Sequence, residues 1–330
     1  MRRRLWWGIA SLDIRAAEDH GIAVTSIDSV SNINLPLNVD DSQLHPTMTE
    51  LPEPQTRWTE MTFPLMLHEQ GIARYRLYRM LPPLGNTVPS EAARREVVEA
   101  LQARVEEKYL RYHNPAIPVQ RLSTVIGRVV SAKLDLVSKL QWLTVANKKG
   151  IHGLEPNEEM LVSACQILEY GIQAREDEIL RSYRWAVEIY PQYHTLLYVL
   201  WHLCVRPEGP SVERAWAAVH TSFDHEFMTR TVGTSNMRGC KWAALRMLKD
   251  KALRIRASGE KRGSMTTEKS GEDARSPSDK VGWSSQPLPD STMGASENGI
   301  NWVMDGTEPP DWHALVDDFG MNGELTAFLD

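Results

Sequence analysis

The feature that most constrains this chain is a long run of apolar residues at helical spacing near its middle. Between Gln120 and Leu143, apolar side chains recur every three or four positions, which places them on one face of a helix. A helix of this length with one apolar face needs other helices to cover it. The run therefore predicts a core of packed helices. Its apolar positions are Leu122, Val125, Ile126, Val129, Val130, Leu134, Val137 and Leu140.

Similar but weaker patterns predict further helices on both sides of this run. Prolines and good capping residues separate them, and the stretch from 21 to 56 is a long loop with at most a short strand over 22–27. Together these patterns predict an all-α fold of about eight helices. The predicted helices cover residues 5–16, 58–81, 90–113, 120–143, 158–190, 195–205, 211–223 and 241–257.

The N-terminal stretch MRRRLWWGIASLDIRAAEDHG is compatible with an export signal or with a packed helix. A signal needs an apolar run followed by a small-residue cleavage site. Here the apolar run ends at Leu12, charged residues follow at once, and no such site occurs. We therefore favour a helix whose apolar face needs a partner, and which is partly exposed if no preceding helix covers it. That face consists of Leu5, Ile9, Leu12 and Ala16.

The charge of the chain is divided unevenly along its length. The net charge is -6, but the residues after Lys280 hold nine acids and no base, so residues 1–280 carry +3. Residues 258–300 are poor in apolar side chains, and we expect them to be disordered. Residues 301–330 alternate acidic and apolar side chains, which is typical of an activation segment; the alternative is a helix docked on the domain. The apolar positions of this segment are Trp302, Trp312, Leu315, Phe319 and Phe328.

Sequence patterns for catalysis or metal binding are weak. No dinucleotide-binding, Walker, serine-hydrolase or zinc-protease motif occurs, so we predict that the chain is not an enzyme. The pair Asp40–Asp41 and the run Asp224–Glu226 are acidic, but a loop or a helix cap explains them better than a metal site. His202 and Cys204 lie two positions apart and do not share a helix face. We expect no cofactor, and no run is long enough to predict a membrane span.

Two further groups of side chains have alternative interpretations. The tryptophans predict core packing in the first place and a pocket for a small apolar ligand in the second. The basic side chains near the end of the helical region predict either a solvated helix face or a phosphate-binding or nuclear-import patch. That patch consists of Lys249, Lys251, Arg254, Arg256, Lys261 and Arg262.

Several segments, in one consistent order, resemble a known family. They read RRRLWWGIASLDIRAAEDHG, LPLNVDDSQLHP and WTEMTFPLMLHE, followed by RLSTVIGRVVSAKLDLV, ILEYGIQ and GPSVERAWAAV. This series resembles the middle homology region of fungal binuclear zinc-cluster transcription factors. The positions that carry the resemblance are Arg4, Leu5, Trp6, Trp7, Asp13, Arg15, Glu18, Leu35, Pro36, Asn38, Asp41, Thr59, Glu60, Met61 and Thr62.

The resemblance implies a helical regulatory domain of a nuclear protein that follows a DNA-binding zinc cluster. Many such proteins act as dimers and control metabolic or secondary-metabolite genes. The zinc cluster needs six closely spaced cysteines, whereas this chain has Cys165, Cys204 and Cys240, far apart. The zinc-binding head is therefore missing from this chain. We accordingly divide it into an N-terminally incomplete regulatory domain (1–257), a linker (258–300) and an acidic-hydrophobic segment (301–330).

The predicted function is transcription regulation in the nucleus through protein–protein contacts. The expected partners are a homo- or heterodimeric related regulator and, through the acidic segment, the transcription machinery; DNA is contacted indirectly. The alternative is a truncated ligand-binding or dominant-negative dimerisation partner of a full-length regulator. A helical enzyme with an acidic metal site is a distant third. The sequence names neither the target genes nor a small-molecule ligand.

Overall fold

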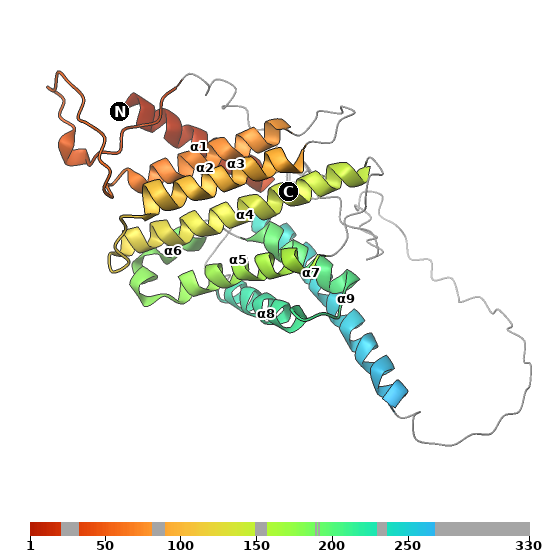
Figure 1. Ribbon diagram of the computed structural model, residues 1–330. Coiled ribbons are helices and arrows are strands. Elements are labelled where there is room, and N and C mark those ends of the chain that lie inside the picture. Colours follow the sequence, from red (N-terminus) through yellow and green to blue (C-terminus); the bar gives the residue numbers. More distant parts are fainter. Residues whose placement is uncertain are drawn as a thin grey trace, which may run out of the picture.

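A computed structural model describes residues 1–20, 33–80, 90–148, 157–188, 190, 192–229 and 236–267 (Figure 1). All regular elements within these ranges are helical, which confirms the predicted all-α fold. The helices are α1 (Arg2–His20), α2 (Thr62–Met80), α3 (Glu91–Arg104), α4 (Pro118–Lys148), α5 (Glu158–Glu176), α6 (Arg184–Glu188), α7 (Tyr193–Val205), α8 (Val212–Thr229) and α9 (Asn236–Thr267). Short helical turns η2 (Asp41–Gln43), η3 (Val105–Leu110) and η4 (Glu178–Tyr183) join them.

Helix α4 is the centre of the fold. Its 31 residues span about 46 Å, and it lies between α1–α3 on one side and α5–α8 on the other (Figure 1). The helix contributes to each of three apolar clusters: Leu140 to one with α5, α7, α8 and α9, Leu134 to one with α2 and α3, and Ile126 to one with η4 and α6. The apolar periodicity read from the sequence thus marks the helix on which the others are packed.

Helix α7 is the most buried element of the C-terminal half. All residues from Thr195 to Cys204 are buried, and the helix packs against α5, α8 and α9. A helix that is apolar all round belongs inside a protein. Its sequence, YVLWHLC at the centre, therefore forms core, and the expectation that His202 is a packed residue agrees with its complete burial.

Close approaches and buried ion pairs fix the N-terminal helices. At Gly127 of α4, an added Cβ atom would lie 2.5 Å from the sulfur of Met66. Helices α2 and α4 therefore pack closely at a position where glycine has no side chain. From α3, the buried Arg94 reaches α4 and bonds the Asp135 carboxylate at 2.7 Å and the Ser138 hydroxyl at 2.8 Å. These contacts hold α2, α3 and α4 in one layered unit.

One helix predicted from the sequence is broken in the structure. The range 158–190 was predicted as continuous, but α5 ends at Glu176, and η4 and α6 follow. Asp177 causes the break, because its carboxylate accepts the backbone N–H of Ile179 at 2.9 Å and caps the next turn. The same carboxylate pairs with Arg121 of α4, which anchors the new turn on the central helix.

Other boundaries also differ from the predictions. The helix predicted over 90–113 changes to a π-helical turn at Val105, and α9 continues to Thr267, ten residues into the predicted linker. The possible strand at 22–27, the remainder of the linker and the segment 301–330 lie outside the described residues. Of the helices that are described, none has both the length and the apolar character needed to cross a bilayer.

Candidate interaction surfaces

The first segments of the family resemblance meet at one end of the molecule. Arg4 of α1 pairs with Asp41, and its guanidinium also donates to the carbonyl of Val39 at 3.3 Å. Nearby, the indole N–H of Trp7 donates to the carbonyl of Asn34 at 3.2 Å. The loop 33–60 is thereby bound to the first turns of α1. Segments that stand more than 30 residues apart in the sequence form one junction in space.

Asn38 is the hub of this junction. Its amide nitrogen donates to the carbonyls of Gln55 at 2.7 Å and Arg57 at 3.1 Å. Its amide oxygen accepts the hydroxyls of Thr59 at 2.6 Å and Thr62 at 3.2 Å. Both threonines are buried, so these bonds satisfy groups that have lost contact with water. Asn38 thus ties the loop to the start of α2.

Carboxylates complete the junction and are engaged inside it. Glu60 accepts the backbone N–H of Asp41 at 2.7 Å, and Asp40 accepts the backbone N–H of Glu60 at 3.1 Å. A hydrogen bond from Arg57 holds the pKa of Asp40 below its usual value. The adjacent acids considered as a metal pair are therefore held by arginines. Among the described residues, no group of three or more acids, histidines or cysteines is placed to hold a metal ion.

The remaining motif positions serve packing or stay at the surface. Trp6 stands edge-on to Trp7, with 5.0 Å between ring centroids, and the guanidinium of Arg15 lies 4.7 Å from the centre of the Tyr190 ring. Met61 is buried, and Leu35 packs against its cluster. Pro36 is buried in the loop, Asp13 is half-buried, and the side chain of Glu18 lies outside the described residues.

Helix α1 buries the face opposite to the one that the sequence pattern singled out. Trp7, Ala10 and Ile14 are buried against the rest of the domain, while Leu5 and Ile9 are exposed. Leu12, from the same predicted face, is exposed as well, and the side chain of Ala16 is not described. The predicted apolar stripe is therefore not the packing face of α1. The expectation that it is partly exposed agrees with the structure.

The predicted basic patch on α9 is divided between different environments. Lys249 lies 4.3 Å above the ring of Phe223, and Arg256 bonds Glu213 at 2.9 Å. Arg254 is exposed and Lys251 is half-buried. The side chains of Lys261 and Arg262 are outside the described part of α9. Lys249 and Arg256 thus pack on α8. A role of the basic patch in nuclear import stays a prediction.

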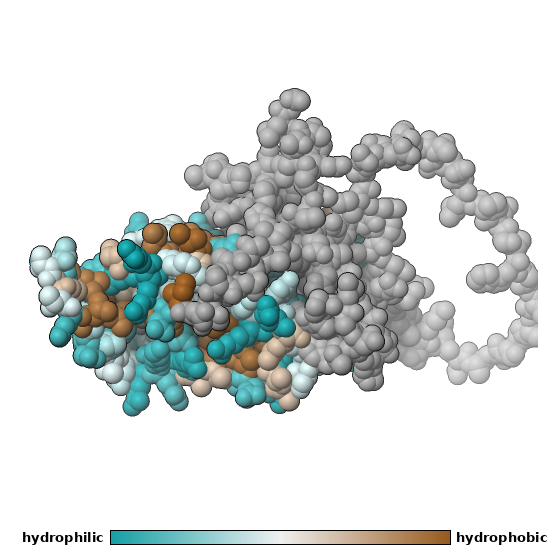
Figure 2. Space-filling model, turned by 90° about the horizontal axis from the view of Figure 1, so that it is seen from above, coloured by the Kyte–Doolittle hydropathy of each residue, from teal (hydrophilic) through white to brown (hydrophobic). Residues whose placement is uncertain are grey.

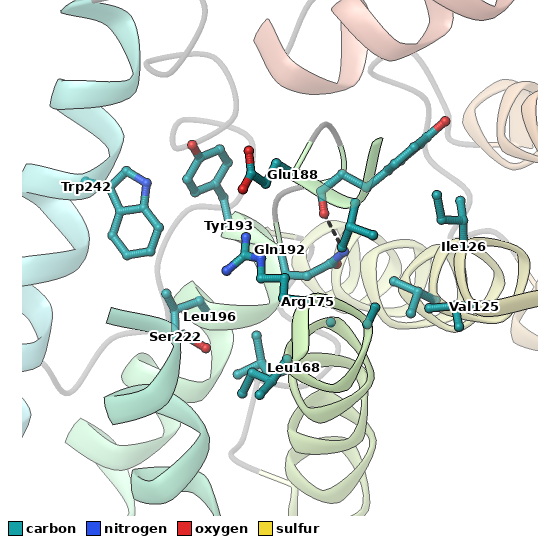
Figure 3. Close-up of a pocket in the computed structure, with 16 residues that line it drawn as sticks. Val125, Ile126, Leu168, Arg175, Glu188, Gln192, Tyr193, Leu196, Ser222 and Trp242 are labelled. Carbon is teal, nitrogen blue, oxygen red and sulfur yellow. Dashed lines mark hydrogen bonds between the residues drawn. The ribbon is translucent and has the colours of Figure 1, made fainter. Parts of the chain in front are cut away.

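A small cavity lies where α4–α9 meet, lined by Trp242, Tyr193 and Arg175 (Figure 3). The indole nitrogen of Trp242 and the amide oxygen of Gln192 are buried there without a hydrogen bond to another described residue. The cavity measures about 70 Å³, which leaves room for several water molecules. Its lining combines these polar groups with apolar side chains such as Leu168, and Trp242 is the one tryptophan among the lining residues.

The curated proteins that this chain resembles in sequence are fungal transcriptional regulators. The aurofusarin cluster transcription factor aurR2 of Gibberella zeae is 23% identical over 227 residues, and the transcriptional regulator AacuB of Aspergillus aculeatus 26% over 230. The C6 finger domain transcription factor hasF of Aspergillus fumigatus is 25% identical over 262 residues. The homologues of this chain are fungal C6 zinc-cluster transcription factors. The resemblance read from the motif segments is confirmed.

These transcription factors are much longer than the present chain. The first two matches cover 68% of it and 34% and 31% of the relatives, so the chain spans about a third of their length. Two of the relatives carry the names of biosynthesis clusters, those for aurofusarin and for pyriculol and pyriculariol. No family model matches the chain, and no solved structure does.

The hydrogen bonds and ion pairs that join the motif residues were not predicted from the sequence. Asn38 and Asp41 were identified as motif positions, but nothing in the sequence paired them with Thr59 and Arg4. The available signal was indirect: Asn38, Asp41 and Thr59 are polar residues within the segments that carry the resemblance. In the structure, these residues form a latch between α1, the loop and α2.

Proposed function

We propose that this chain regulates transcription by binding other proteins and carries out no bond chemistry. The observation that supports this most is its homology to fungal transcription factors over about two thirds of its length. The described polar motif residues are consistent with such a role, because they bond within the domain, Arg4 to Asp41 and Asn38 to Thr59. The helical part then acts as a rigid support for protein-binding surfaces.

The acidic-hydrophobic segment is the part that we propose to contact the transcription machinery. Its acids keep apolar side chains such as Trp312 and Phe319 accessible in water, and those side chains supply binding area to a partner. A segment of this kind orders on binding, so it can engage partners that differ in shape. The helical domain would set when and where the segment is presented.

A reporter assay tests this role. Residues 281–330 are fused to an unrelated DNA-binding domain, and we expect expression above that of the DNA-binding domain alone. Trp312→Ala combined with Phe319→Ala removes the two largest apolar side chains near the cluster of acids and should abolish the increase. Thr292→Ala combined with Thr326→Ala is the matched control and should leave it intact. Absence of any increase from the unchanged segment contradicts the activation role.

We further propose that the chain works in the nucleus. The basic side chains at the end of α9, with Lys261 and Arg262, are the candidates for import. A fluorescent fusion of the chain should accumulate in nuclei, and Lys261→Ala with Arg262→Ala should reduce the accumulation. Arg214→Ala, which removes an exposed cation paired with Glu169 elsewhere on the surface, is the control. A distribution unaffected by the first pair of changes would argue against this import signal.

A further inference from the structure

Helix α1 carries an exposed apolar stripe. The exposed fractions are 69% for Leu5, 57% for Ile9 and 68% for Leu12, and the spacing of four and three residues puts them on one face. Seen from above, the side of the molecule on which α1 lies shows hydrophobic patches among hydrophilic side chains (Figures 1 and 2). Three large apolar side chains in a row on a surface helix are a feature of binding sites.

At its N-terminal end the stripe runs into a groove of about 290 Å³. Met1 belongs to both, since it lies one turn before Leu5. The groove is lined by three arginines from the N-terminal end of the chain and by apolar side chains, most of them from the loop 33–60. Its lining residues are Met1, Arg2, Arg3, Arg4, Pro36, Leu37, Val39, Leu44 and Leu51. We call the stripe and the groove together the α1 surface.

Of the three arginines of the α1 surface, only Arg4 forms an ion pair among the described residues. Arg4 pairs with Asp41, but Arg2 and Arg3 are exposed and form no ion pair with another residue that the structure describes. Glu50 is exposed next to Leu51, so the positive edge lies on the helix side of the groove. A fitting occupant therefore has apolar side chains at helical spacing and acids that can face Arg2 and Arg3.

One segment of the same chain has both properties. Trp312, Leu315, Val316 and Phe319 follow the spacing three, one and three, which is one face of a helix. Three acids lie among them, Asp311, Asp317 and Asp318, and no base occurs after Lys280. The apolar face matches the stripe of α1, and the acids are opposite in charge to Arg2 and Arg3.

The chain between the two parts is long enough for this contact. Asp311 follows Thr267, the end of α9, by 44 residues. Fully extended, a chain of that length reaches about 145 Å. The central helix α4 is about 46 Å long, so the segment can reach any face of the domain.

We propose that residues 311–319 dock on the α1 surface of their own chain. The apolar side chains of the segment cover Leu5, Ile9 and Leu12, and its carboxylates face Arg2 and Arg3. While docked, the segment withholds Trp312 and Phe319 from other partners, which makes the contact autoinhibitory. The docking itself does not depend on whether the segment activates transcription, so the two proposals can fail separately.

Paramagnetic relaxation in the full chain tests the docking. Gly8→Cys carries a nitroxide beside the stripe, because a Cβ at Gly8 meets nothing within 4 Å. Cys240→Ser removes one other thiol, and Cys165 and Cys204 are buried away from the label. The indole N–H signal of Trp312, identified by its loss in Trp312→Phe, should be strongly broadened by the label. Leu5→Ser with Ile9→Ser and Leu12→Ser should restore it.

Matched controls separate the possible outcomes. Met247→Ser with Leu253→Ser and Ile179→Ser removes exposed apolar side chains elsewhere and should leave the broadening unchanged. A mixture of spin-labelled chain and isotope-labelled chain without nitroxide reports contacts between copies. Broadening in the single chain and not in the mixture supports the proposal. An unbroadened Trp312 signal overturns it, and so does broadening that also appears in the mixture, which assigns the α1 surface to a second copy.

Discussion

At the scale of single residues, most polar motif positions have structural roles. Asn38 joins four groups, and the buried Glu69 accepts hydrogen bonds from Arg104, Lys108 and Tyr109. Burial raises the pKa of Glu69, but these donors outweigh it and bring the pKa below its usual value. Such residues are visible in a sequence as polar positions, whereas their partners are not, because the partners come from other elements.

Replacing Asn38 tests the latch. Asn38→Ala removes four hydrogen bonds and leaves the hydroxyls of Thr59 and Thr62 without their acceptor. The free energy of unfolding, measured by urea denaturation, should fall by about 2–4 kcal/mol. Asn34→Ala is the matched control, because Trp7 uses the backbone carbonyl of Asn34 and not its side chain. Equal effects of the two changes would contradict the latch.

His68 makes stability depend on pH. Burial lowers its pKa to about 4 from 6.5, and its ring shares a hydrogen bond of 2.6 Å with the Ser11 hydroxyl. The unfolded chain therefore takes up the proton first as pH falls. Stability should be lost between pH 6.5 and about 4, by about 3 kcal/mol for this group. In His68→Asn, which cannot titrate, this part of the pH dependence should disappear; identical profiles would refute the assignment.

At the scale of elements, the sequence predicted what periodicity and capping can show. The central helix was found because apolar side chains recur every three or four positions from Leu122 to Leu140, although the structure buries α4 on more than one side. The break at Asp177 was missed because apolar residues continue beyond it in the sequence. The contacts that fix the break are an ion pair with Arg121, which belongs to another helix, and a capping hydrogen bond from the N–H of Ile179. The face of α1 was misjudged because α1 has apolar residues on both sides, and only packing selects Trp7 and Ile14.

Close packing between helices gives a prediction at this scale. At Gly127 a Cβ atom would lie 2.5 Å from the sulfur of the buried Met66, so Gly127→Ala must displace the Met66 side chain between α2 and α4. We expect it to lower the free energy of unfolding by about 1–3 kcal/mol. Gly8→Ala meets open space on α1 and should raise stability by about 0.5–1 kcal/mol. Thermal unfolding of both variants measures the difference; a stabilising Gly127→Ala would show that the two helices are not in close contact.

At the scale of the whole molecule, the chain combines a packed helical domain with an acidic segment. The net charge of the segment is opposite in sign to the net charge of the rest of the chain. The domain ties its motif segments into one junction and leaves the α1 surface exposed. The acidic segment carries the complementary charge and apolar spacing. Both features were recognised in the sequence separately, but their match depends on which face of α1 is buried, and that follows from the fold.

The most direct test of the account is the reporter output of the full chain tethered to a promoter through an unrelated DNA-binding domain. The account predicts activation that is weaker than that of residues 281–330 alone. It also predicts that Leu5→Ser with Ile9→Ser and Leu12→Ser raises the output, and that Trp312→Ala with Phe319→Ala abolishes it. Output equal to that of the DNA-binding domain alone, for the full chain and for every variant, would contradict the proposal that this chain regulates transcription through its acidic segment.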